Sequence, residues 1–206
     1  MKSILKNKRG FTLIEVMLAI AIICLIGGLF VELLCATTDS YYRTYNQNDA
    51  ADYAQLYARA IENNILRDID VSPDDTYEYS IVGDGSGCPY FLQREGTNLF
   101  SSGLAQITNS SGVPKWRIYI GDVTYTDHVC SYTLYMVDNY RNPGTLVLEY
   151  PTSFYVPEGN TAFYKADGSA PRTIQIMETG THEIRVTWDN HSRTIYVAGS
   201  MNVTLS

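Results

Sequence analysis

The sequence predicts an α+β fold in which a long N-terminal α-helix packs on a C-terminal antiparallel β-sheet domain. Between residues 11 and 71 there is no proline, and apolar residues first form a block and then recur every three or four positions. From Ser72 onward, glycines punctuate short segments in which apolar and polar residues alternate, as in strands with one buried face. A chain of 206 residues accommodates one such domain with an appendage.

The first part of the predicted helix has the length and composition of a membrane span. Residues 11–34 are apolar or glycine except for Thr12, Glu15 and Glu32, and such a block can cross a hydrocarbon core of about 30 Å. The basic residues before it are Lys2, Lys6, Lys8 and Arg9. This flank favours a cytoplasmic location for residues 1–10 and an outward location for the remainder. A secretory signal peptide would have a shorter apolar core, and a simple signal anchor does not explain Glu15, because carboxylates inside membrane segments usually mark function.

The second part of the helix is predicted to be amphipathic. Its apolar face consists of Ala50, Ala54, Tyr57, Ile61 and Ile65. A continuous helix from residue 11 to about residue 69 would be about 90 Å long at 1.5 Å per residue. We therefore expect residues 11–36 to cross the membrane and mediate assembly, and residues 37–71 to pack on the β-rich extracellular domain formed by residues 72–206.

Alternation is clearest in residues 116–120, 130–136 and 146–150. Residues 183–188 and 193–197 flank a predicted four-residue hairpin loop at 189–192. We expect one antiparallel sheet across the amphipathic helix. The stretches 83–115 and 151–172 are predicted to be rich in loops, and their exposed tyrosines are interpreted as ordinary surface residues more readily than as ligand contacts.

The N-terminal residues resemble the type IV prepilin signature: basic residues, Gly10, the sequence FTLIEV from Phe11 to Val16, and an unbroken apolar run. The resemblance implies that a membrane peptidase cuts between Gly10 and Phe11, removing residues 1–10 as a leader peptide, and that Phe11 becomes the N-methylated terminus. Glu15 matches the acidic residue of the family. Its pairing with the Phe11 amine of a neighbouring subunit would set axial register more than it would add stability, because burying two charges is costly. We interpret Glu15 as an assembly residue.

The same resemblance implies partners, location and function. The partners would be other pilin subunits, the prepilin peptidase/methyltransferase and the membrane. The chain would lie in the cytoplasmic membrane as a single-pass precursor and then in an extracellular or cell-surface filament. A minor pilin in adhesion, motility or surface assembly is the leading hypothesis, and a pseudopilin of a type II secretion or competence DNA-uptake system is the alternative. A membrane-anchored binding module that never polymerises is the second alternative. The formal charge of -7 opposes nucleic-acid binding by the isolated subunit.

No enzyme, cofactor or metal site is predicted. The histidines His128, His182 and His191 have no catalytic motif around them, and a calcium site formed by Asp74, Asp75 and Asp84 has little support from their spacing.

The cysteines divide into two pairs by context. Cys88 and Cys130 are a candidate disulfide in the polar region, whereas Cys24 and Cys35 lie in or beside the apolar block. Gly27 and Gly28 have two interpretations, and the sequence leaves both open. The resemblance implies that the helix can extend or melt there on assembly. Alternatively, the two small residues allow close packing of helices.

Overall fold

The computed structural model describes residues 12–71, 76–82, 91–94, 97–98, 115–156, 174–188, 191–198 and 200–205. The chain divides into two compact units, Met1–Tyr45 and Asn46–Ser206. The helix is α1 (Leu13–Val71). The strands are β1 (Thr76–Val82), β2 (Phe91–Arg94), β3 (Thr97–Asn98), β4 (Trp116–Thr126), β5 (Val129–Asp138), β6 (Leu146–Tyr155), β7 (Ile174–Thr179), β8 (His182–Trp188), β9 (His191–Val197) and β10 (Ser200–Leu205). The predicted α+β fold class is confirmed.

The strands of the second unit form three antiparallel sheets. A five-stranded sheet has the order β3-β2-β1-β10-β7, a three-stranded sheet has the order β4-β5-β6, and β8 pairs with β9. The strand that pairs with β1 is thus β10, from the other end of the domain, so Tyr77 faces Val203 in register. The prediction of antiparallel strand pairing is confirmed. The arrangement of the described strands in three sheets was not predicted.

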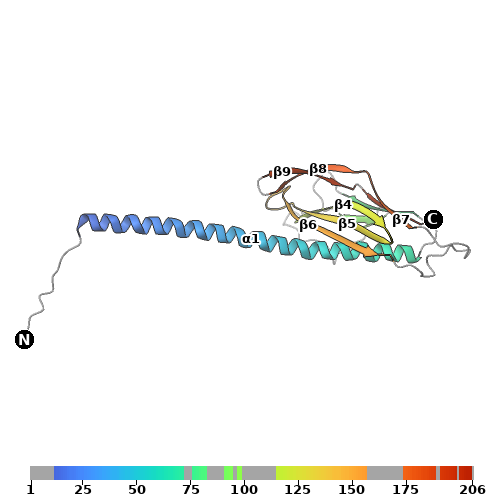
Figure 1. Ribbon diagram of the computed structural model, residues 1–206, viewed down its shortest axis with the longest axis horizontal. Coiled ribbons are helices and arrows are strands. Elements are labelled where there is room, and N and C mark those ends of the chain that lie inside the picture. The colour runs from blue at the N-terminus through green and yellow to red at the C-terminus, as the bar shows by residue number, and fades with distance from the viewer. Residues whose placement is uncertain are drawn as a thin grey trace, which may run out of the picture. The chain divides into compact units, whose positions relative to one another are not determined.

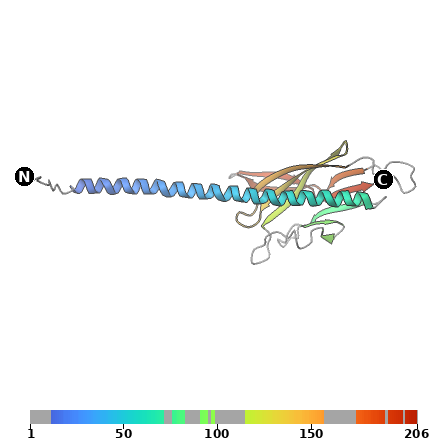
Figure 2. The same ribbon diagram turned by 90° about the horizontal axis from the view of Figure 1, so that it is seen from below.

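The C-terminal part of α1 packs on one face of the three-stranded sheet and on residues of β7 and β10 (Figures 1 and 2). All five side chains of the predicted apolar face, Ala50, Ala54, Tyr57, Ile61 and Ile65, are buried. The sheet meets them with side chains at alternating positions: Trp116, Ile118, Ile120, Cys130, Tyr132, Leu134 and Met136. The apolar side chains that recur every three or four residues in the helix and every two residues in the strands therefore pack in the same core.

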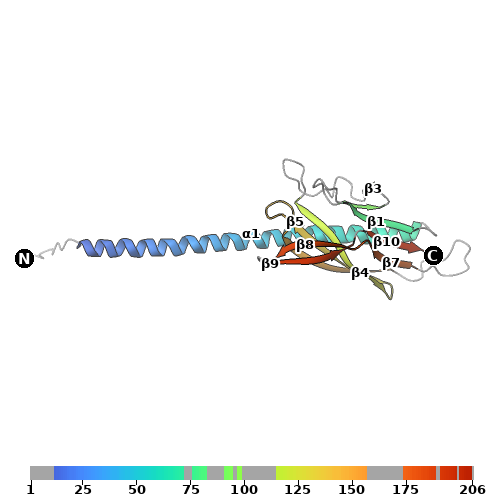
Figure 3. The same ribbon diagram turned by 90° about the horizontal axis from the view of Figure 1, so that it is seen from above.

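The opposite face of the three-stranded sheet is covered by the β8–β9 hairpin, seen nearest the viewer in Figure 3. This second core contains Tyr119, Tyr135, Val137, Leu146, Val186, Ile195 and Val197. The hairpin is joined to β4 by a hydrogen bond from the Ala198 amide to the Ile120 carbonyl, 2.7 Å long. Gly121 permits this close approach, because a Cβ atom there would lie 2.6 Å from the Tyr196 carbonyl oxygen.

Two loop predictions need correction. The predicted four-residue loop at 189–192 is wrong, because β8 and β9 pair as far as Trp188 and His191. Two-residue loops suit the twist of paired strands, which favours this shorter connection. Residues 151–155, predicted as loop, belong to β6, whose Pro151 is tolerated because β6 is the edge strand of its sheet.

The predicted loop region 83–115 likewise contains the short strands β2 and β3.

The turn between β4 and β5 has an uncommon backbone. Asp127 and His128 have φ angles of 51° and 64°, and Thr126 pairs directly with Val129. Positive φ at both central residues is the requirement of a type I′ hairpin turn, which natural sequences usually meet with Asn-Gly. Asp and His adopt positive φ more often than most residues, but less readily than the Asn-Gly pair.

Candidate functional site

The first turn of α1 is closed by reciprocal hydrogen bonds between Thr12 and Glu15. The Thr12 amide and hydroxyl both donate to Glu15 Oε2, at 2.8 and 3.0 Å, and the Glu15 amide lies 3.4 Å from Thr12 Oγ1. This is a capping box, which satisfies amide groups that the helix itself leaves without partners. In a membrane such amides have no water to bind, so the capping box lowers the cost of placing the helix end there.

The arrangement leaves part of the Glu15 carboxylate available. Both hydrogen bonds from Thr12 end on Oε2, and Glu15 Oε1 makes none among the residues that the structure describes. A carboxylate can accept several donors at once, so Oε1 can accept a cationic donor while the capping box persists. Glu15 therefore combines two roles chemically, as the N-terminal cap of α1 and as a potential ion-pair partner.

Thr12 was not identified as functional from the sequence. The spacing Thr-x-x-Glu before an apolar run is the sequence signature of a capping box and could have identified it. The two residues of the predicted cleavage, Gly10 and Phe11, lie outside the described residues. The structure consequently places Glu15 at the start of the helix but does not test the predicted cut or the methylation.

The apolar block of α1 has no cover within its own unit. Every described side chain from Thr12 to Tyr45 is exposed, and α1 contains a stretch long and apolar enough to cross a membrane. Apart from the adjoining residues and the local helix backbone, no heavy atom lies within 4 Å of a Cβ built at Gly27 or at Gly28. This surface is thus available to lipid or to another protein, and the two interpretations of Gly27 and Gly28 stay predictions.

Cys130 lies in the core between helix and sheet, 0% exposed and without a disulfide partner among the described residues, whereas Cys88 lies outside them. Burial raises the pKa of Cys130 to about 12. Because the thiolate is the reactive form, a nucleophilic role for Cys130 is disfavoured. The disulfide between Cys88 and Cys130 stays a prediction.

The histidines do not converge. His128 lies in the β4–β5 turn, whereas His182 and His191 lie at opposite ends of the β8–β9 hairpin. No group of three or more His, Cys, Asp or Glu residues that could hold a metal occurs in the part of the chain that the structure describes. The acidic residues Asp74, Asp75 and Asp84, considered for calcium, lie outside that part.

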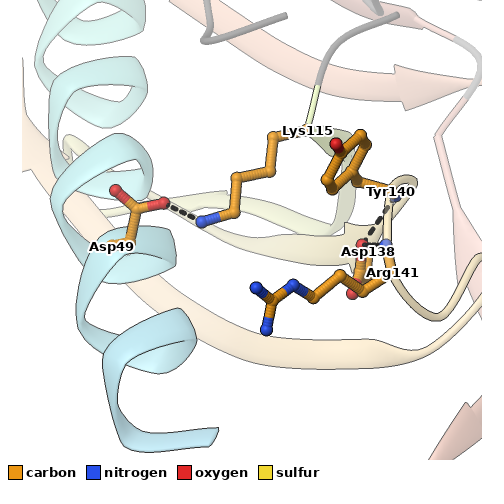
Figure 4. Close-up of polar contacts among 5 residues, drawn as sticks. All are labelled: Asp49, Lys115, Asp138, Tyr140 and Arg141. Atoms are coloured by element: carbon orange, nitrogen blue, oxygen red, sulfur yellow. Dashed lines mark hydrogen bonds and ion pairs between the residues drawn. The ribbon is translucent and has the colours of Figure 1, made fainter. Parts of the chain in front are cut away.

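The main polar cluster of the second unit lies where the sheet meets the first turns of its helix (Figure 4). Lys115 Nζ lies 2.5 Å from Asp49 Oδ2 and also 4.6 Å from the ring centroid of Trp116. The buried carboxylate of Asp138 accepts the backbone amides of Tyr140, Arg141 and Asn142, at 2.7, 3.1 and 3.2 Å. These bonds order the β5–β6 turn, so we interpret the cluster as structural.

Comparison with known proteins assigns the N-terminal segment. Residues 5–31 match the family model of the prokaryotic N-terminal methylation motif, which is the type IV prepilin signature. No curated protein and no solved structure matches the chain significantly. The motif contains Glu15 and runs directly into the exposed apolar helix, and it indicates a structural subunit that assembles with other pilins after processing by a prepilin peptidase. The chain therefore carries the type IV prepilin signature ahead of an antiparallel β-domain, and this signature supports a type IV pilin-like or pseudopilin protein.

Proposed function

We propose that this chain is a minor pilin, a low-abundance subunit of a type IV pilus or related filament that acts in adhesion, motility or surface assembly. The observation that carries the proposal is the methylation motif at residues 5–31, which extends into a helix whose side chains are exposed at every described position from Thr12 to Tyr45. Lipid covers such a surface in the precursor, and other subunits cover it in a filament. Prepilin peptidase would cut between Gly10 and Phe11, and Phe11 would then carry the methylated amine.

Glu15 is the residue that we expect to control entry into the filament. Cleavage creates an ammonium group at Phe11, which is costly to bury without a partner. Oε1 of Glu15 in a neighbouring subunit can accept that ammonium while Oε2 still caps its own helix. The ion pair would form only when two subunits stand at one axial offset, so it selects the register of assembly.

The size and charge of the β-domain support the minor-pilin hypothesis over the alternatives. A head of several sheets with long connections is harder to pack densely along a filament than a small compact one, which favours a subunit present in few copies. Loss of the basic leader makes the remaining chain still more acidic than the formal charge of -7. An acidic surface repels DNA phosphates, so the competence role is less favoured than a secretion pseudopilin.

The test measures the intact mass of the protein from its native membrane and counts surface filaments containing it. We expect a chain beginning at methylated Phe11. Glu15→Gln removes the charge at nearly constant volume and should remove the chain from filaments, whereas Glu32→Gln, a matched change in the same apolar block, should not. An uncleaved chain, or assembly that is indifferent to Glu15, would contradict the proposal and favour an anchored binding module that does not polymerise.

Filaments that appear only on the secretion of folded cargo would instead identify a type II secretion pseudopilin.

A further inference from the structure

The β8–β9 hairpin covers only one end of the outer face of the three-stranded sheet, the face opposite α1. There it packs on Tyr119, Tyr135 and Val137, which are buried. Towards the β4–β5 turn the same face continues as two rows of residues paired across the strands. These rows are Thr124–Ser131–Ser153 and Thr126–Val129–Tyr155, and we call them the open face.

The open face is rich in hydroxyl groups that the fold itself does not use. Every residue of the two rows except Val129 carries a hydroxyl, and all of them are exposed apart from Ser131, which is half-buried. None of these hydroxyls makes a hydrogen bond to another residue in the part of the chain that the structure describes. By contrast, the hydroxyls of Thr145 and Thr187 bond to each other, 3.1 Å apart, where the hairpin meets the sheet. Because a hydroxyl both donates and accepts, the open face can bind a ligand whose groups do the same.

The open face is uncharged, although the protein has a formal charge of -7. Two carboxylates lie at its border. Asp122, in the β-bulge of β4, accepts the Tyr135 hydroxyl at 2.6 Å, and Asp127 is exposed in the β4–β5 turn. Acids at the border disfavour polyanions, and the face itself has nothing to pair with a charged group placed on it. This charge pattern is complementary to a neutral ligand.

Tyr155 supplies an aromatic ring that the β4–β5 turn holds in place. Its side chain is 54% exposed, and the His128 ring packs on it in an edge-to-face arrangement, with 6.4 Å between the ring centroids. The His128 carbonyl accepts the Val156 amide at 2.8 Å, which joins the turn to the end of β6. Asp127 and His128 have positive φ in this turn, and such outliers often accompany a functional site.

We propose that the open face binds a neutral glycan presented outside the cell, with one sugar ring stacked on Tyr155. A pyranose ring has a face of C–H groups that packs on an aromatic ring, and a rim of hydroxyls that bond to serine and threonine. Tyrosine beside serine gives rigid contact area together with adaptable hydrogen bonding. The inference names a ligand class for the adhesive role in the proposed function, and it rests on that function for its location outside the cell.

A protein partner is a poorer fit to the open face. Stable protein interfaces bury about 800 Å² on each partner around a core of large apolar side chains. The two rows contain only Val129 and Tyr155 as large apolar residues, and both lie in the same row. One aromatic ring among small hydroxyl residues matches the size of a sugar unit more closely than that of a protein interface.

The test is binding of the full chain to a microarray of neutral oligosaccharides of glucose, galactose, mannose and N-acetylglucosamine. The chain is kept in lauryldimethylamine oxide micelles, because this detergent has no sugar headgroup to compete, and the best-bound glycan is then titrated by calorimetry. We expect wild type to bind, and Tyr155→Ala to bind about tenfold or more weakly, as loss of a central aromatic anchor does. Tyr155→Phe keeps the ring and should bind within about twofold of wild type. The matched control is Tyr196→Ala, which removes a tyrosine that is 58% exposed on the hairpin and should leave binding unchanged.

The turn offers a second variant that should fold at least as well as wild type. Asp127→Asn combined with His128→Gly suits positive φ at both positions, so its melting temperature should not fall. Its binding should nevertheless weaken by about threefold or more, because the Tyr155 ring loses the neighbour that orients it. Wild-type affinity in this variant would contradict the part that His128 plays in the site.

Glycan binding and filament assembly can fail separately. Glu15→Gln should bind the glycan like wild type, because the open face belongs to the β-domain. A wild-type chain that binds no neutral glycan would overturn this inference alone, and so would binding that persists in Tyr155→Ala or that heparin, a polyanion, abolishes. An uncleaved chain that stays outside filaments but binds through Tyr155 would support the glycan site while contradicting the proposed function.

Discussion

Gly121→Ala tests whether the β8–β9 hairpin is packed on the sheet as tightly as the structure indicates. The added methyl group would lie 2.6 Å from the Tyr196 carbonyl oxygen and 3.1 Å from Cε2 of Tyr135. Ordinary contacts begin near 3.4 Å, so β9 would have to move by most of an ångström. That movement strains the 2.7 Å hydrogen bond from Ala198 to Ile120 and loosens the second core.

The expected loss follows from two opposing effects. Overpacking a well-packed site typically costs about 1–3 kcal/mol. Replacing glycine by alanine restricts the unfolded chain and returns about 0.4–1 kcal/mol. We therefore expect the free energy of unfolding to fall by about 1–2 kcal/mol, which lowers the urea midpoint by about 0.5–1 M if the slope is about 2 kcal/mol per molar.

The assay is urea unfolding of the full chain in detergent micelles, followed by tryptophan fluorescence, to which the buried Trp116 contributes. Thr126→Ala, at an exposed position of the same strand, is the control and should change stability by less than about 0.5 kcal/mol. Equal midpoints for Gly121→Ala and wild type would refute the reasoning, because they would mean that β9 does not lie against Gly121.

Four further predictions follow from the same structure. Replacing Asp127-His128 by Asn-Gly should raise the free energy of unfolding by about 1 kcal/mol in thermal melts, because both positions have positive φ; an unchanged melting temperature would count against a strained turn. Asp138→Ala should cost about 2–4 kcal/mol in urea titrations, since three backbone amides lose a charged acceptor, and a loss no larger than that of Thr126→Ala would contradict its role. Cys130 should resist alkylation in the native protein at pH 8 while the exposed Cys35 reacts, as mass spectrometry can show. In the reduced protein Cys130 is a thiol, and burial raises its pKa from 9.0 to about 12, so this thiol ionises first in the unfolded chain. The stability that it contributes is complete below pH 9 and is lost as the pH rises towards 12, and Cys130→Ala should weaken that pH dependence.

Elements set by local periodicity could be predicted from the sequence. The helix face from Ala50 to Ile65 and the strands around Ile118 and Leu134 follow from spacings of three to four and of two, and burial confirms them. Local patterns also located Glu15, because an acidic residue inside an apolar block is costly unless it has a function. The Thr12 capping box was equally local but was not recognised.

Features that depend on pairing between distant segments could not be predicted. Nothing in the pattern of β8 and β9 indicates that they leave the main sheet and cover its second face, because alternation reveals that a strand has a buried side but not which element buries it. The pairing of β1 with β10 could not be predicted for the same reason, because alternation does not identify the partner of a strand. The Asp127-His128 turn was not predicted for a different reason: it lacks the Asn-Gly or Asp-Gly pair by which a two-residue hairpin turn is recognised in a sequence.

The first buried side chain of α1 is Ala50, and this position explains how one helix serves two purposes. From Ala50 onward the β-domain buries one face of the helix, so that part is stable in a single subunit. From Thr12 to Tyr45 every described side chain of the helix is exposed, and helices in proteins gain most of their stability from packing. Residues 13–34 can exchange lipid for neighbouring subunits, because both are apolar. The apolar block alone would therefore favour neither the precursor nor the filament strongly.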